Sequence, residues 1–113
     1  MIYATFERTD KKYNKFTLSG HAESGPYGHD LVCAAVSALT IGTANNLSRI
    51  ASIEPEIKAN EEEGGFLEVV VPFVDDAMHQ RTAQILLENL YLSLLDIQKE
   101  YREFISVSLN NLN

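Results

Sequence analysis

The residues that could do chemistry in this chain of 113 lie around its only cysteine, Cys33. Two of the three histidines, His21 and His29, come shortly before it. Asp30 lies three residues before the cysteine, and Ser37 lies four residues after it. A cysteine nucleophile needs a nearby base to take the thiol proton, and histidine most often supplies it. The segment therefore predicts nucleophilic catalysis by Cys33.

Cys33 is expected near the start of a helix that spans residues 31 to about 53. Apolar residues keep a helical spacing through this range, and Asp30 is a good N-cap residue immediately before it. With this cap, Cys33 is the third helical residue, where unpaired N–H groups and the helix dipole favour an anion. That anion is the thiolate, the reactive form of cysteine. Ser37 lies one turn further on the same face and could donate a hydrogen bond in the site.

Of the two nearby histidines, His21 is the expected general base and His29 the reserve. A base has to stand within about 2.6–3.2 Å of the group that it deprotonates. His21 follows Gly20 at the end of a predicted strand, which can hold that geometry, whereas His29 lies on a glycine-bearing loop. The first-turn N–H groups of the helix could then stabilise the oxyanion that forms on the scissile carbonyl.

The loop over residues 22–29 is expected to act as a lid on Cys33. Turn-forming and flexible residues are concentrated in it, which suits a hinge. A closed loop would exclude water and hold a bound substrate across the thiol. The candidate substrate-contacting residues of this loop are Gly25, Pro26, Tyr27, Gly28 and His29.

Other interpretations of the same segment are open. A lone cysteine is most often a small buried hydrophobe, and Cys33 could also be an oxidisable thiol in a non-catalytic, ribosome-associated or redox-sensing protein. The tripeptide His-Ala-Glu at 21–23 resembles half of a zinc deaminase signature, but that signature needs a further pair of cysteines. No familiar zinc-ligand spacing joins the histidines to Cys33. We therefore expect no metal and no cofactor.

The elements that must position these residues follow the order ββαββαβ. The predicted elements are a hairpin over 2–20, the helix over 31–53, a hairpin formed by 55–60 and 66–72, a helix over 77–100 and a strand from 105. Alternating apolar residues indicate the strands, and a stripe of leucines indicates the second helix, which Asp75 or Asp76 can cap. The expected fold class is α+β, with two long helices packed in a second layer on a mostly antiparallel or mixed sheet.

Length and composition limit the number of domains and the cellular setting that we expect. A chain of 113 residues with 45% hydrophobic and 22% charged residues predicts one domain over 1–113. No apolar run reaches membrane-spanning length without a polar break, so we expect no membrane contact. The N-terminus lacks the pattern of a signal peptide, and a single cysteine fits a reduced, cytoplasmic setting.

Charge and the first helix suggest the partners. The net charge of −7 opposes direct contact with nucleic acid phosphates and suits a basic partner. Residues 31–42 are apolar nearly all round, which predicts burial on more than one side of the helix. Gly42 would allow close approach of a second copy, so we expect a homodimer.

Two stretches, Gly-His-Ala at 20–22 and Asp-Leu-Val-Cys-Ala-Ala-Val-Ser-Ala-Leu at 30–39, resemble the ribosomal-processing cysteine protease family, Prp. The resemblance extends along the chain in length and element order. It implies that Cys33 is the nucleophile and His21 the general base. Supporting roles are implied for Gly20, Asp30 and Ser37.

The resemblance also implies a substrate. Members of this family remove a short N-terminal extension from large-subunit ribosomal protein twenty-seven, a step needed for ribosome assembly. The peptide recognised is apolar, with an aromatic residue just before the cut. The family resemblance further implies a homodimer whose loop before Asp30 moves over the substrate. A ribosomal protein is basic, which agrees with the acidic charge of this chain.

Overall fold

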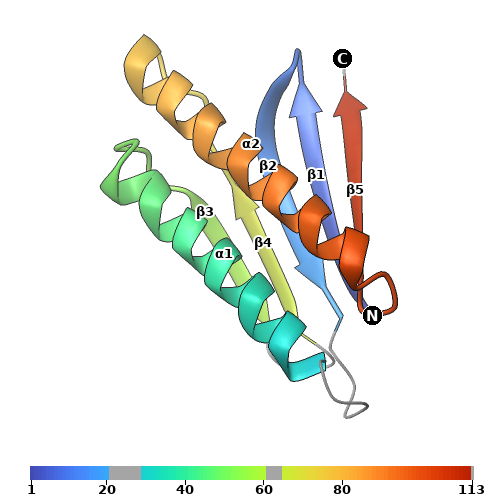
Figure 1. Ribbon diagram of the computed structural model, residues 1–113. Coiled ribbons are helices and arrows are strands. Elements are labelled where there is room, and N and C mark those ends of the chain that lie inside the picture. Colours follow the sequence, from blue (N-terminus) through green and yellow to red (C-terminus); the bar gives the residue numbers. More distant parts are fainter. Residues whose placement is uncertain (21–28, 61–64, 113) are drawn as a thin grey trace.

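The computed structural model describes residues 1–20, 29–60 and 65–112, with the side chains of residues 29 and 30 left out. Within these ranges, five strands and two helices follow the predicted order ββαββαβ (Figure 1). The strands are β1 (Ile2–Thr9), β2 (Lys12–Ser19), β3 (Glu56–Asn60), β4 (Phe66–Val70) and β5 (Ile105–Leu112), and the helices are α1 (His29–Arg49) and α2 (Ala77–Glu100). The predicted α+β class, with helices layered on one sheet, is confirmed.

The five strands form one sheet in the order β3-β4-β2-β1-β5. The three pairs β1–β2, β2–β4 and β3–β4 are antiparallel, and β1–β5 is parallel. Two hairpins account for β1–β2 and β3–β4. The α2 crossover returns the chain so that β5 runs in the same direction as β4 and β1, because a helix of this length spans the sheet from end to end.

One face of the sheet carries the helices and the other is open to solvent. On β1, the buried residues Ile2, Ala4 and Phe6 point toward the helices and alternate with more exposed neighbours. The opposite face carries polar cross-strand pairs such as Lys15 and Glu7, whose Nζ and Oε2 atoms lie 2.8 Å apart. This alternation is the period of two that the sequence predicted for the first hairpin.

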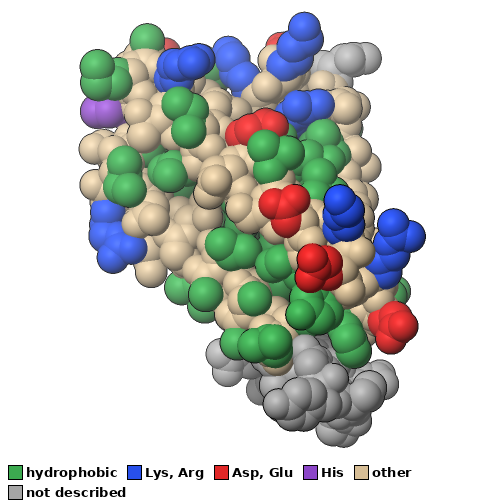
Figure 2. All heavy atoms as spheres, viewed as in Figure 1, with side chains coloured by type: hydrophobic (Ala, Val, Ile, Leu, Met, Phe, Trp, Pro, Cys, Tyr) green, Lys and Arg blue, Asp and Glu red, His purple; other side chains and the backbone are tan. Residues whose placement is uncertain are grey.

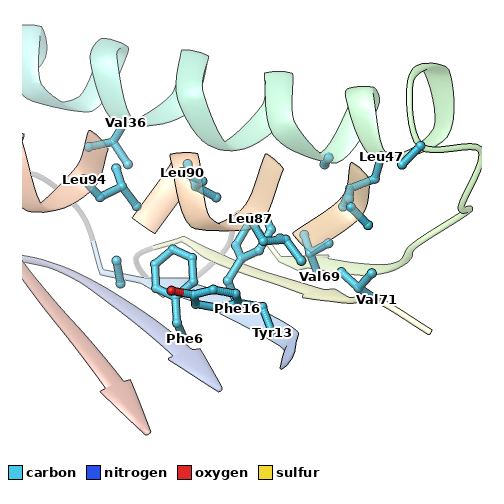
Figure 3. Packing of buried hydrophobic residues seen from close by; sticks show 14 of the residues in the cluster. Phe6, Tyr13, Phe16, Val36, Leu47, Val69, Val71, Leu87, Leu90 and Leu94 are labelled. Carbon is cyan, nitrogen blue, oxygen red and sulfur yellow. The ribbon is translucent and has the colours of Figure 1, made fainter. Parts of the chain in front are cut away.

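The core lies between the sheet and the helices, as the close-up in Figure 3 shows. Its labelled residues come from both helices and from three strands or strand ends: Val36, Leu47, Leu87, Leu90, Leu94, Phe6, Tyr13, Phe16, Val69 and Val71. The Phe6 ring stacks on that of Phe16 with 5.8 Å between centroids, and its edge meets Tyr91 of α2 at 5.2 Å. Aromatic pairs at these separations add to the stabilisation from buried area. Burial raises the pKa of the Tyr13 phenol, so this ring stays uncharged within the cluster.

The start of α2 resolves an alternative that the sequence left open. Asp76, and not Asp75, is the N-cap, because its carboxylate accepts a hydrogen bond of 2.9 Å from the backbone N–H of His79. Further along, the Gln84 side chain accepts from the backbone N–H of Tyr13 at 2.6 Å and donates to its carbonyl at 2.9 Å. The helix therefore docks on the sheet through polar contacts as well as leucines.

Residues Leu31–Arg49 of α1 are long and apolar enough to cross a membrane by length and composition alone, with a hydropathy of 1.3. The central helix of a soluble protein has the same features. In this structure Val36 and Leu47 of the helix are buried in the core. The expectation of no membrane contact stays a prediction.

The leucine face of α2 should dominate the stability of the fold. Leu90 is fully buried, whereas Leu92, two residues later, is 50% exposed. Leu90→Ala should lower the free energy of unfolding by about 2–5 kcal/mol, since it removes packed methyl groups and leaves a cavity. Leu92→Ala should change it by less than about 1 kcal/mol. Urea denaturation of both variants measures the difference, and equal losses would contradict this packing.

Candidate active site

Cys33 lies in the wall of a pocket of about 390 Å³ between α1 and one end of the sheet. The α1 wall consists of residues on one helix face between Cys33 and Ile41. The sheet contributes the beginning of β1, the end of β2, and the adjoining ends of β3 and β4. One helix and the ends of four strands therefore line the pocket that contains the thiol.

The pocket is lined largely by apolar side chains. Leu18, Val36 and Leu67 face it from β2, α1 and β4. Figure 2 shows hydrophobic side chains gathered at this end of the molecule, next to the residues drawn in grey. A pocket of this size and lining suits an apolar side chain of a peptide, with the half-buried Cys33 at its edge.

The start of α1 differs from the prediction. Asp30 was expected to cap a helix beginning at Leu31, but α1 begins at His29. Asp30 is therefore the second helical residue, and Cys33 is the fifth instead of the third. The sequence could not separate these alternatives, because an acidic residue is favourable both at the cap and in the first turn.

Because α1 begins at His29 and not at Leu31, different backbone N–H groups can assist the reaction. The N–H of the fifth helical residue already has an i−4 carbonyl as its partner, whereas those of the first residues do not. The N–H groups that α1 does not bond within the helix are therefore those of its first turn, one turn before Cys33. The influence of the helix dipole also falls off beyond the first turn. A base beside the thiol consequently matters more than the helix end.

The helix face that follows Cys33 continues into the pocket. Ser37 is exposed and lines it, as its spacing of four residues predicted. Thr40 and Ile41 line it as well, and the sequence interpretation missed both. Thr40 is buried, and its hydroxyl donates to the carbonyl of Val36 at 2.8 Å, so it closes the wall without an unsatisfied polar group. Their spacing of seven and eight residues from Cys33 was the available signal.

Gly20 lines the pocket opposite α1 and has no room for a side chain. Its φ of +91° lies in the region that favours glycine, and a Cβ there would overlap the carbonyl oxygen of Met1. Its N–H donates to the carbonyl of Gly65 at 3.1 Å. His21 is the next residue in the sequence. The predicted base therefore directly follows a residue of the pocket wall.

The structure brings together Gly20, Cys33 and Ser37 of the predicted site. His21 and the loop residues Gly25, Pro26, Tyr27 and Gly28 lie outside the described residues. His29 and Asp30 are in the first turn of α1, but their side chains are not described. The base and the lid therefore stay predictions.

Among the side chains of residues 1–20, 31–60 and 65–112, no group of three or more His, Cys, Asp or Glu residues could hold a metal ion. His21 and His29, the two histidines nearest Cys33 in sequence, are not among these side chains.

The sequence matches a family of known proteins over nearly its whole length. The family model described as cysteine protease Prp matches residues 1–106. The ribosomal processing cysteine protease Prp of Bacillus subtilis is 35% identical over 111 residues, which is 97% of this chain and 98% of that protein. The protein of the same description from Staphylococcus aureus is 34% identical over 97 residues, covering 86% and 87% of the two chains.

Solved structures show the same fold. A crystal structure from Streptococcus mutans superposes with a TM-score of 0.89 at 30% identity, covering 99% of this chain and 96% of that one. The ribosomal processing protease Prp of S. aureus, crystallised with a substrate peptide, gives a TM-score of 0.82 at 32% identity, covering 97% and 100%. The same S. aureus protein has also been crystallised with a covalently linked product peptide.

A half-buried thiol near the start of a helix, set in an apolar pocket at the end of a sheet, is an arrangement suited to thiol-dependent peptide hydrolysis. The family match over residues 1–106 identifies the particular group. This chain belongs to the cysteine protease Prp family, and it is a cysteine protease.

Gly20 offers a direct test of how the sheet positions the site. Gly20→Ala should lower the free energy of unfolding by more than about 1–2 kcal/mol, because the backbone conformation is unfavourable and the methyl group meets a carbonyl. It should also reduce peptide cleavage, since the strand end bearing His21 must shift. The neighbouring Ser19→Ala, on the solvent face, should stay within about 0.5 kcal/mol of the parent. Denaturation and cleavage assays on both variants measure the difference. Equal effects of the two substitutions would contradict the proposed constraint.

Proposed function

We propose that this protein is the endopeptidase that removes the short N-terminal extension of large-subunit ribosomal protein twenty-seven. The cut bond follows an aromatic residue within an apolar peptide. The observation that carries the proposal is the position of Cys33 in the wall of an apolar pocket. Similarity along nearly the whole chain to a ribosomal processing cysteine protease supports the choice of substrate.

The reaction uses Cys33 and His21 as a pair. His21 takes the proton of the Cys33 thiol, and the thiolate attacks the scissile carbonyl. Free N–H groups in the first turn of α1 stabilise the negative charge on the carbonyl oxygen. His21 then protonates the leaving amine as the carbon–nitrogen bond breaks, which leaves a thioester on Cys33. Water hydrolyses the thioester, releasing the extension and restoring the thiol.

The charge and the single thiol suit this substrate and its location. A net charge of −7 would attract a basic ribosomal protein and would repel nucleic acid phosphates. A free catalytic thiol needs reducing conditions, which supports a cytoplasmic enzyme that works without contact to a membrane.

A homodimer is part of the proposal. Leu31 and Ile41 on α1 are 63% and 54% exposed. Within the described part of the chain, no atom lies within 4 Å of the position that a Cβ on Gly42 would occupy, apart from the atoms of its own helix backbone and chain neighbours. Exposed apolar residues on a helix, with a glycine next to one of them, favour close approach of a second copy.

The nucleophile can be tested on the intact substrate. The parent protein should shorten the extended ribosomal protein by the mass of its extension, whereas Cys33→Ala should stay folded, bind the substrate and leave it uncut. Mass spectrometry of the products measures both results. Cleavage by Cys33→Ala at a rate near that of the parent would contradict the mechanism. No cleavage by the parent would favour the alternative of a non-catalytic, redox-sensing protein.

The two histidines should differ in the same assay. His21→Ala should lower the cleavage rate by about 10²–10⁴ because the general base is lost. His29→Ala should retain much of the parent activity, since His29 is not attached to the strand end at Gly20. If His29→Ala proved the more damaging change, the role of base would pass to His29.

The proposed homodimer predicts the mass of the protein in solution. Sedimentation at micromolar concentration should give the mass of two chains, and Gly42→Ala should shift the population toward one chain because it adds a methyl group at the contact. Asn89→Ala, on the exposed side of α2, serves as the control and should sediment like the parent. A parent protein of single-chain mass would contradict the dimer.

A further inference from the structure

A second hollow lies at the end of the molecule where α2 ends and β5 begins. The loop after α2 and the N-terminal end of β1 lie beside each other here (Figure 1), and the backbone N–H of Ile2 donates to the carbonyl of Phe104 at 2.8 Å. The hollow has a volume of about 640 Å³, and its described lining consists of Met1, Gln98, Lys99, Arg102, Ile105 and Ser106. None of these residues lines the Cys33 pocket, so the two sites are separate.

The charge of this hollow is opposite to that of the whole chain. The net charge of the chain is −7, yet the ionisable side chains of the described lining, Lys99 and Arg102, are both basic. Within the described part of the chain, neither of them forms an ion pair with a carboxylate. Glu100 and Glu103 line a neighbouring hollow and are not part of this lining. Two cations without a counter-ion favour an anion in the hollow.

The end of α2 accounts for one of these charges and not for the other. Lys99 lies in the last turn of α2, where a positive charge interacts favourably with the helix dipole. Arg102 follows the C-cap residue Tyr101 and lies outside the helix. The turn that carries Arg102 is held by the N–H groups of Phe104 and Ile105, which donate to the Tyr101 carbonyl at 2.9 and 3.2 Å. The backbone of Arg102 is thus fixed beside the hollow before any ligand binds.

The other polar side chains of the lining add hydrogen-bond donors. The side-chain oxygen of Gln98 accepts from the backbone N–H of Val107 at 2.6 Å, so the amide NH2 group is the part that can serve a ligand. Ser106 is exposed and offers its hydroxyl. A phosphate group carries nearly two negative charges and at least three acceptor oxygens, whereas a carboxylate carries one charge and two oxygens. Two cations with two further donors therefore suit a phosphate better.

We propose that this hollow binds a phosphate group, either as free phosphate or on a small molecule such as a nucleotide. Lys99 and Arg102 supply the charge, and Gln98 and Ser106 orient the phosphate oxygens. The volume of the hollow leaves room for more than the phosphate itself. Because the site is separate from Cys33, the proposal does not depend on the proposed peptidase function.

An NMR titration of the isotope-labelled full chain with inorganic phosphate measures this binding without any substrate peptide. Saturable shift changes are expected at the backbone amides of Lys99, Arg102 and Ser106. Acetate at the same ionic strength should bind at least about fivefold more weakly, because it has one charge and fewer acceptor oxygens. Shift changes spread over all the surface lysines, or equal affinities for the two anions, overturn the proposal.

Adenosine monophosphate in the same titration distinguishes the two sources of the phosphate group. An affinity at least about tenfold above that of inorganic phosphate assigns the site to a nucleotide. Equal affinities assign it to free phosphate.

Two variants, each lacking one positive charge, provide the second arm. Arg102→Gln should weaken phosphate binding at least about fivefold, because a charge-assisted hydrogen bond is lost. Arg81→Gln is the matched control. Arg81 precedes Lys99 by about 27 Å along α2, which exceeds the screening length at physiological salt, so the affinity should stay within about twofold. Both arginines are exposed, and denaturation curves check that the variants are folded. Equal weakening by the two substitutions, or none by Arg102→Gln, overturns the site.

Discussion

The arrangement of the site depends on the backbone at Gly20. Its N–H is bonded to Gly65 at the start of β4, and its Cα lies against the carbonyl of Met1 at the start of β1. Three strand ends therefore meet without space for a side chain between them. His21 is the next residue in the sequence, so the packing of the sheet holds the residue that precedes the predicted base.

The pocket exists because the two helices have different roles. The leucines of α2 fill the core above β1 and β2, and Gln84 ties the helix to the backbone of Tyr13. α1 packs beside α2 and contributes Val36 and Leu47 to the same core, but its other side faces the space near β3. α1 therefore contributes to the core and to the wall of the Cys33 pocket at the same time.

The chemistry follows from where α1 begins. Because the helix starts at His29, Cys33 lies in its second turn, and the free N–H groups lie one turn before the thiol. The helix end is thus better placed to stabilise charge on a bound carbonyl than to ionise the thiol. Proton removal is then the task of a base beside the thiol, and His21, which follows Gly20 in the sequence, is the predicted one.

The sequence by itself determined the order of the elements and the candidate reactive residue. Periods of two and 3.6 residues predicted both hairpins and α2 over 77–100, because local burial patterns repeat along each element. Cys33 was identifiable as the candidate nucleophile because it is the only thiol and has histidines nearby. The tertiary structure alone decided that β4 pairs with β2, which brings Leu67 opposite Leu18 and sets β3 at the edge. Strand order depends on contacts between residues far apart in the chain, and no local pattern encodes which strands become neighbours.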